Sequence, residues 1–289
     1  MAIWHLTWSA DGRRTFFSEE AACRRAVRAL LRVAGRRAVL FNLVDDHVHL
    51  VADVDAAELG HLTRTVLLAL RACTEVPFSP VFVKEVAERA HLETLVRYVL
   101  DQGPHHGLSA HPALATGSCF SDMVGARVLP GFELRLPSLL PRFRMRAAYA
   151  VVGLGTDRPL APADDAALAA AGPARLLAAC SSATAAPPDL AGRESCALDA
   201  RTAFVQLSRV AGFSSAVVAK VGGIPLRSAQ FLAHREPSPA VLGAVRLRIA
   251  LEDAVRALPP VVREPDGPVY DPAPDLPALP PAGAPGRLR

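Results

Sequence analysis

The first hundred residues of the chain alternate between short apolar runs and longer stretches with helical spacing. Residues 2–9 (AIWHLTWS) alternate like a strand, and AVLFNLV at 38–44 and HVHLVADV at 47–54 read as two more strands. Asp45-Asp46 separates the last two runs and fits a hairpin turn. SPVFVKEVA at 79–87 has the composition of a fourth strand.

Three helices are predicted between and after these strands. Residues 18–37 open with Ser18 and two glutamates, which suit a helix N-terminus. Residues 56–75 and 91–102 repeat apolar positions at helical spacing. The resulting order, βαββαβα, predicts an α+β fold with the ferredoxin-like split arrangement, an antiparallel sheet with helices on one face.

The remainder of the chain differs in composition. Residues 126–190 are rich in alanine and proline, residues 194–256 contain successive helical segments, and prolines crowd the chain after Leu258. The sequence therefore predicts four parts: a first domain at 1–130, an Ala/Pro-rich connector with short helices at 131–191, a helical domain at 192–258 and a disordered tail at 259–289.

Composition narrows the class of protein but does not decide its function. A hydrophobic content of 51% over 289 residues is ample for a buried core. The five cysteines are odd in number and form no CxxC pair, which favours a reducing compartment over a disulfide framework or a zinc ribbon. Because no signal-peptide pattern and no long uncharged apolar run is present, we expect a cytoplasmic protein outside the membrane. The net charge of +4 slightly favours anionic partners such as nucleic acid.

Two histidines stand one residue apart in the third predicted strand. Residues i and i+2 of a strand point to the same face, so His47 and His49 present their imidazoles side by side, as two ligands of one cation must. The chain has nine histidines, however, and a chance pair of core histidines explains the isolated motif equally well.

Tyr98 and Gln102 lie at i and i+4 on one face of the third predicted helix. If this helix packs across the sheet, the Gln102 amide oxygen completes a two-histidine site for a hard cation such as Mg²⁺ or Mn²⁺. Tyr98 then stands one turn from the metal. Considered alone, the helix fits equally a packing role for Tyr98 and a surface position for Gln102.

Together these motifs resemble the single-tyrosine HUH transposases, especially the REP-associated tyrosine transposases and their relatives in small insertion sequences. The likeness covers roughly residues 1–130. WHLTWS matches the opening strand, FNLVDDHVHLVADV the HUH strand, RYVLDQGPHHGLSAHP the tyrosine helix and its following turn, and GSCFSDMVG the segment that closes the core. Three motifs depart from the family pattern: Asp45-Asp46 replaces the usual Pro-Asn, Gln102-Gly103-Pro104 replaces Asn-Pro-Val, and Ser118-Cys119 stands where Trp-Ser-Ser is common.

The resemblance implies a metal-dependent endonuclease and strand transferase that acts on single-stranded or hairpin DNA. His47, His49 and Gln102 would hold Mg²⁺ or Mn²⁺, and Tyr98 would displace a 3′ oxygen and become linked to the 5′ phosphate. Another 3′-hydroxyl would reverse the step and rejoin strands. In some relatives the tyrosine helix comes from a partner subunit, so the protein could act as a monomer or as a homodimer. A role on DNA would place it at the nucleoid.

Residues 215–232 (SAVVAKVGGIPLRSAQFL) predict a helix-turn-helix, with Gly223 in the turn. It is similar to the C-terminal DNA-binding module of replication initiators. A plain helical bundle that supports the first domain is the alternative. The core positions are expected to be Ala219, Ile224, Ala229 and Leu232, and the side chains facing DNA bases Arg227, Gln230 and Arg235.

Further arginines are candidates for contacts with the phosphate backbone. In RFRMR at 142–146, Arg142 and Arg144 alternate with apolar residues, which suits either a nucleic-acid strand or the start of an amphipathic helix. In the first domain the candidates are Arg13, Arg14, Arg24 and Arg25.

Two other functions compete with the nuclease. One is a domesticated DNA-binding protein or regulator that keeps the fold and performs no chemistry. The other is a metal-dependent phosphoesterase for small nucleotides, in which Tyr98 only packs and no covalent adduct forms.

Overall fold

The structure is a computed structural model that describes residues 2–17, 19–102, 111–133, 135–155 and 159–259. Residues 1–259 form one compact unit. Three of the features expected from the sequence lie wholly or almost wholly outside the described residues: the Ser18 helix cap, the turn that follows the tyrosine helix, and the proline-rich tail.

Four antiparallel strands form the sheet: β1 (Ala2–Ser9), β2 (Ala38–Leu43), β3 (His47–Val54) and β4 (Phe82–Glu85). Their order is β2-β3-β1-β4, and every neighbouring pair is antiparallel. A hydrogen bond from Val44 N to His47 O (3.0 Å) closes the tight turn at Asp45-Asp46. The α+β fold class is therefore confirmed, with a four-stranded antiparallel sheet.

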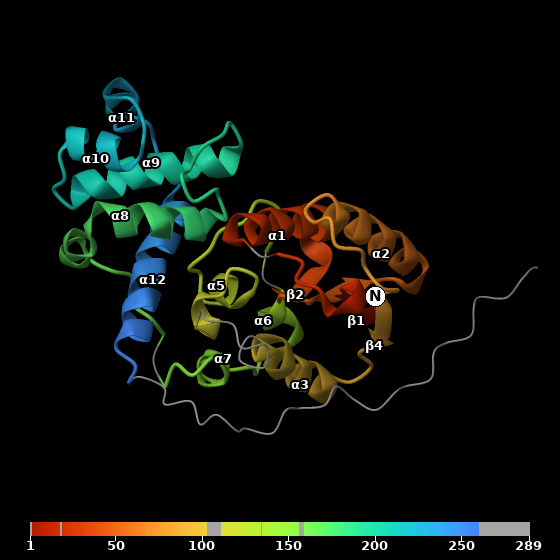
Figure 1. The fold of residues 1–289 in the computed structure, drawn as a ribbon. Coiled ribbons are helices and arrows are strands. Elements are labelled where there is room, and N and C mark those ends of the chain that lie inside the picture. Colours follow the sequence, from red (N-terminus) through yellow and green to blue (C-terminus); the bar gives the residue numbers. More distant parts are fainter. Residues whose placement is uncertain (1, 18, 103–110, 134, 156–158, 260–289) are drawn as a thin grey trace, which may run out of the picture. The chain divides into compact units, whose positions relative to one another are not determined.

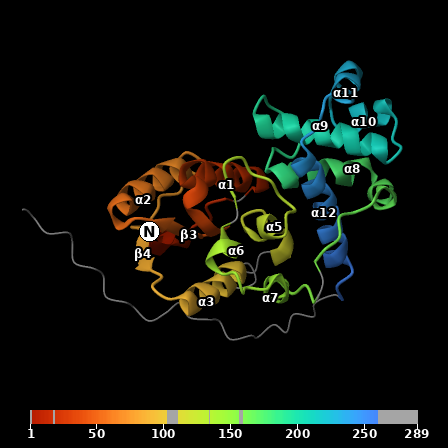
Figure 2. The ribbon, with the colours of Figure 1, turned by 180° about the vertical axis from the view of Figure 1, so that it is seen from behind.

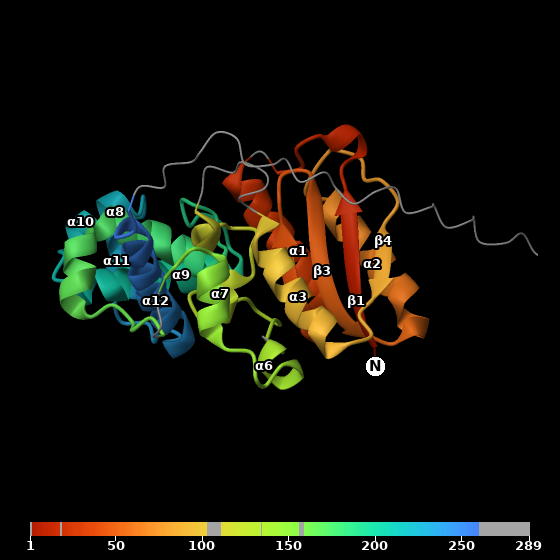
Figure 3. The ribbon, with the colours of Figure 1, turned by 90° about the horizontal axis from the view of Figure 1, so that it is seen from below.

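Helices cover both faces of this sheet. On one face lie α1 (Glu20–Ala34) and α2 (Ala56–Arg71), while α3 (Arg89–Leu100) crosses the other (Figures 1 and 3). Helices on one face only were expected from the sequence, and this expectation was wrong. The physical reason is the burial of two neighbouring strands: every residue of β2 and all of β3 beyond His47 are buried, so both faces need an apolar cover.

A segment after α3 protects the free edge of β2. Leu43 N donates to Gly117 O, and Cys119 N donates to Phe41 O, both at 3.1 Å. A Cβ at Gly117 would lie 2.0 Å from the Leu43 carbonyl oxygen, so only glycine allows this approach. Arg127, itself buried, donates to the carbonyl of Ser118 and holds the segment in place.

A second apolar core lies in the helical part of the chain, where α8 (Asp165–Thr184), α9 (Ser195–Val210) and α12 (Pro239–Arg256) pack together (Figures 1 and 2). α10 (Ser215–Val221) and α11 (Leu226–Leu232) pack against α9. The remaining short elements are α5 (Phe120–Met123), α6 (Leu136–Leu139), α7 (Met145–Val151) and the 3-10 turns Asp11–Arg13, Gly35–Arg37 and Pro112–Leu114.

α8 differs from the predicted connector. It is broken at Gly172, as expected for an Ala/Pro-rich stretch, yet its second half contributes buried residues to the helical core. Among the described residues, α8 is also the one helix whose length and composition would allow it to cross a membrane, and a third of that stretch is buried in the protein. Its packing against α9 and α12 is that of a core helix.

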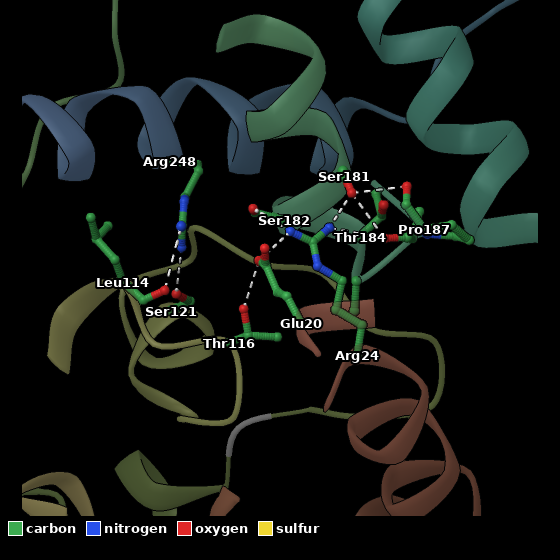
Figure 4. A network of polar contacts seen from close by, with 12 residues as sticks. Glu20, Arg24, Leu114, Thr116, Ser121, Ser181, Ser182, Thr184, Pro187 and Arg248 are labelled. Atoms are coloured by element: carbon green, nitrogen blue, oxygen red, sulfur yellow. Dashed lines mark hydrogen bonds and ion pairs between the residues drawn. The ribbon is translucent and has the colours of Figure 1, made fainter. Parts of the chain in front are cut away.

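Arginine side chains join α1 to the helical core (Figure 4). Arg24 is 3% exposed; it donates to the Ala186 carbonyl (2.9 Å) and to the Ser182 and Ser181 hydroxyls, and it pairs with Glu20. The expectation that Arg24 contacts the DNA backbone was therefore wrong, because its guanidinium is buried and its polar partners come from the protein.

Candidate metal and tyrosine site

The four residues predicted to carry chemistry lie together on the face of the sheet that α3 covers. The His47 and His49 rings, both from β3, are 4.5 Å apart between centroids. The Tyr98 ring lies 5.4 Å from that of His49, and Gln102 Oε1 lies 3.2 Å from His47 Nε2. Residues separated by about fifty positions in the sequence thus meet at one point.

Regular secondary structure explains this meeting. His47 and His49 share a face because strand side chains alternate. Tyr98 and Gln102 are one helical turn apart, and Gln102 Nε2 donates to the Tyr98 carbonyl oxygen at 3.0 Å. Because the amide NH₂ group makes this bond, the carbonyl oxygen of the same amide is the atom that faces His47.

The contact between His47 Nε2 and Gln102 Oε1 depends on which ring nitrogens of His47 carry hydrogen. His47 Nδ1 lies 2.6 Å from Asp46 Oδ1, and an ionised carboxylate only accepts, so Nδ1 carries a hydrogen. In the neutral ring, Nε2 then has a lone pair directed at another acceptor, Gln102 Oε1. Such a contact is repulsive unless a cation or an additional proton lies between the atoms. Two donors on adjacent positions around Mg²⁺, each about 2.1 Å from it, are about 3.0 Å apart, which is close to the observed 3.2 Å.

His49 is held by two residues of β1 that the sequence did not mark as part of a site. Its Nδ1 lies 3.0 Å from His5 Nε2 and 3.2 Å from Thr7 Oγ1, both on β1. Burial, together with the nearby His91, Lys84 and His47, lowers the pKa of His5 to about 4, so His5 is neutral at pH 7. The alternation of AIWHLTWS places His5 and Thr7 on one face, but their proximity to His49 depends on the strand register.

Asn42 fixes the position of the tyrosine helix. It is 3% exposed, stands opposite His49 in the β2–β3 pair, and donates to the Val99 carbonyl oxygen at 2.7 Å. Val99 follows Tyr98 directly, so this bond ties the helix to the strand beside the histidines. The sequence signal for Asn42 is an amide within the apolar run AVLFNLV.

The tyrosine borders solvent, whereas the histidines are largely enclosed. Tyr98 is 46% exposed, and His49 is 2% exposed. A hollow of about 290 Å³ lies beside Tyr98 and is lined also by Thr94, Arg97, Asp101 and Val151. A molecule from solvent can therefore reach Tyr98 while the two histidines stay largely within the fold.

The described part of the chain contains no group of three or more His, Cys, Asp or Glu residues placed to hold a metal. The candidate ligand set is different in kind: two imidazoles and one neutral amide. Such nitrogen and oxygen ligands leave positions open for phosphate oxygens.

The predicted DNA-contacting residues lie elsewhere on the surface. Arg142 and Arg144 are exposed, and the alternate residues Phe143 and Met145 pack against the core of the sheet. α7, which begins at Met145, packs against α3. The two arginines therefore precede a helix that contacts the tyrosine helix.

In the helical part, Arg227, Gln230 and Arg235 are all exposed, as expected. The inward positions Ala219, Ala229 and Leu232 are buried, and Ile224 is partly buried.

Two glycines shape the connection between α10 and α11. Gly223 adopts a positive φ of 60° in the turn. The glycine before it, Gly222, is required by packing, because a Cβ there would lie 2.9 Å from the Phe204 ring.

No family model, curated protein or solved structure matches the chain. The functional interpretation therefore depends on the geometry of the site and on the motif resemblance described above.

Proposed function

We propose that the protein is a metal-dependent endonuclease and strand transferase for single-stranded DNA, with Tyr98 as the nucleophile. The observation that carries the proposal is the contact between His47 Nε2 and Gln102 Oε1 at 3.2 Å, a separation that suits two ligands of one cation as well as a hydrogen bond, with His49 and Tyr98 beside them. Strand order β2-β3-β1-β4 and the element order βαββαβ support a ferredoxin-like core of the HUH type.

His47, His49 and Gln102 are the residues that would hold Mg²⁺ or Mn²⁺. When bound, the cation would withdraw charge from the scissile phosphate. The Tyr98 oxygen would attack phosphorus and lose its proton, a bond between phosphorus and the 3′ oxygen would break, and that oxygen would leave as a 3′-hydroxyl after gaining a proton. The 5′ phosphate would remain linked to Tyr98 until another 3′-hydroxyl reversed the exchange.

The surface features support a DNA substrate. Tyr98 is accessible beside its hollow, and Arg97 lies on the same wall. α10 and α11, joined by a tight turn at Gly223, would serve as a helix-turn-helix, and they expose Arg227 and Gln230, whose side chains suit guanine and adenine edges. Duplex or hairpin recognition by this pair would place the cleavage site.

The test is covalent trapping. The full chain is incubated with Mn²⁺ or Mg²⁺ and labelled single strands tiled across the DNA that flanks its own gene, and label that survives denaturation is measured. We expect an adduct with the native protein and with Tyr149→Phe, a matched control whose tyrosine lies in α7, and no adduct with Tyr98→Phe or with EDTA.

DNA binding without any adduct would instead support the silent DNA-binding regulator. Hydrolysis of small nucleotides without an adduct would support the phosphoesterase.

A further inference from the structure

A largely buried triangle of polar atoms joins His49 to two residues of β1. Its corners are His49 Nδ1, His5 Nε2 and Thr7 Oγ1, with separations of 3.0 Å, 3.2 Å and 3.4 Å. His5 is 8% exposed and His49 is 2% exposed. Buried polar groups of this kind are costly unless each is hydrogen-bonded, so the triangle requires a definite arrangement of hydrogens.

Strand pairing builds the triangle. Thr7 stands directly opposite His49 in the β1–β3 ladder, and His5, opposite Val51, is the diagonal neighbour on the same face. Opposite and diagonal side chains are within reach of each other across an antiparallel pair. The β1–β3 pairing has no register shift, so the side chains of His5 and Thr7 lie in fixed positions beside the His49 ring.

Two arrangements of hydrogens satisfy the His49–His5 bond. In one, His49 carries its hydrogen on Nδ1 and donates it, and His5 Nε2 accepts. In the other, His5 donates, and the hydrogen of His49 lies on Nε2, where it would block coordination. The Thr7 hydroxyl both donates and accepts, so it fits either arrangement. The two arrangements differ in which nitrogen of His49 has the lone pair.

We propose that His5 and Thr7 are positioning residues that hold His49 as the Nδ1–H tautomer, so that Nε2 is the cation-binding atom. The inference rests on the proposed function, because it assigns a purpose to the tautomer. Under this proposal both histidines carry their hydrogen on Nδ1, because the Asp46 carboxylate accepts from Nδ1–H of His47. Partners that fix the second ring nitrogen orient histidine ligands and strengthen metal binding.

The tautomer is measured without any activity. In metal-free full-length protein labelled with ¹⁵N-histidine, long-range ¹H–¹⁵N spectra at pH 8 identify which ring nitrogen of His49 is protonated, with the signals assigned from His49→Asn. We expect hydrogen on Nδ1. Hydrogen on Nε2 in the native protein would overturn the inference.

Variants then test the cause. His5→Phe/Thr7→Val keeps the side-chain volumes and removes both partners, and we expect the His49 tautomer to change and Mn²⁺ affinity to fall by about 10–100-fold. His5→Gln, which restores an acceptor, should recover most of the affinity. His61→Phe, an exposed histidine on α2, is the matched control and should change neither quantity.

The outcomes separate the two proposals. If the native protein binds Mn²⁺ and the double variant, still folded by circular dichroism, keeps the native tautomer and affinity, the positioning role is wrong and the nuclease proposal stands. If the native protein shows the Nδ1–H tautomer, lost in the double variant, but binds no Mn²⁺ or Mg²⁺, the tautomer assignment stands and the metal-dependent function fails.

Discussion

The α3 face of the sheet and the α10–α11 pair use polar residues in opposite ways. On the α3 face of the sheet, His5, Asn42, His49 and Gln102 are buried and bonded to one another or to the backbone. On α10 and α11 the buried residues are apolar, and Arg227 and Gln230 are exposed. Buried polar groups in a low-dielectric setting hold fixed positions, which suits chemistry, whereas exposed side chains on short helices suit recognition.

The largest expected effect comes from the ligand set. Gln102→Leu and His47→Ala each remove one proposed metal ligand, and we expect cation affinity to fall by more than about 100-fold. Loss of a residue that only hydrogen-bonds to a ligand already costs about 10–100-fold. Gln102→Glu adds a negative charge and should bind Mn²⁺ more tightly than the native protein. Isothermal titration with Mn²⁺ measures both changes, and the exposed His61→Asn serves as control. Unchanged affinity in Gln102→Leu would contradict the ligand assignment.

Asn42 tests whether the buried polar contacts also stabilise the sheet. Asn42→Leu leaves the Val99 carbonyl without its donor, and we expect the free energy of unfolding to decrease by about 1–3 kcal/mol. The rate of adduct formation should decrease as well, because the bond fixes the helix that carries Tyr98. Thr65→Val on α2 should change stability by less than about 0.5 kcal/mol in the same denaturant titration. If Asn42→Leu keeps the native stability and the native rate of adduct formation, Asn42 does not position the tyrosine helix.

The helical part should show the reverse behaviour. Arg227→Ala and Gln230→Ala are expected to weaken binding to a cognate hairpin or duplex by about 1–3 kcal/mol each and to leave stability unchanged, because both side chains are exposed. Adduct formation on saturating single-stranded DNA should persist. Fluorescence anisotropy with labelled DNA measures the binding, with Arg64→Ala on α2 as control. Loss of adduct formation at saturation would show that this division of roles is wrong.

Arg142 and Arg144 should produce the smallest effect. If each contacts one phosphate, alanine at either position reduces the slope of log affinity against log salt by about 1 and affects all sequences alike. Binding measured over a series of salt concentrations tests this. An unchanged slope would mean that the exposed arginines only solubilise the start of α7.

Much of this arrangement was accessible from periodicity. Strand alternation correctly put His47 and His49 on one face of β3, and helical spacing correctly put Tyr98 and Gln102 one turn apart on the same face of their helix. The face that α3 covers was mispredicted, because the side of the sheet on which a helix packs depends on tertiary burial. Likewise His5, Thr7 and Asn42 depend on strand register, and the burial of Arg24 depends on the packing of α8 against α1. Local patterns do not encode such long-range neighbours.

The most direct test of the account is a crystal structure of the full chain with Mn²⁺, analysed by anomalous scattering. The account predicts one strong anomalous peak about 2.1–2.3 Å from His47 Nε2, His49 Nε2 and Gln102 Oε1, with the Tyr98 hydroxyl facing it. A fully occupied Mn²⁺ bound elsewhere, with no anomalous peak beside His47, His49 and Gln102, would contradict the central claim.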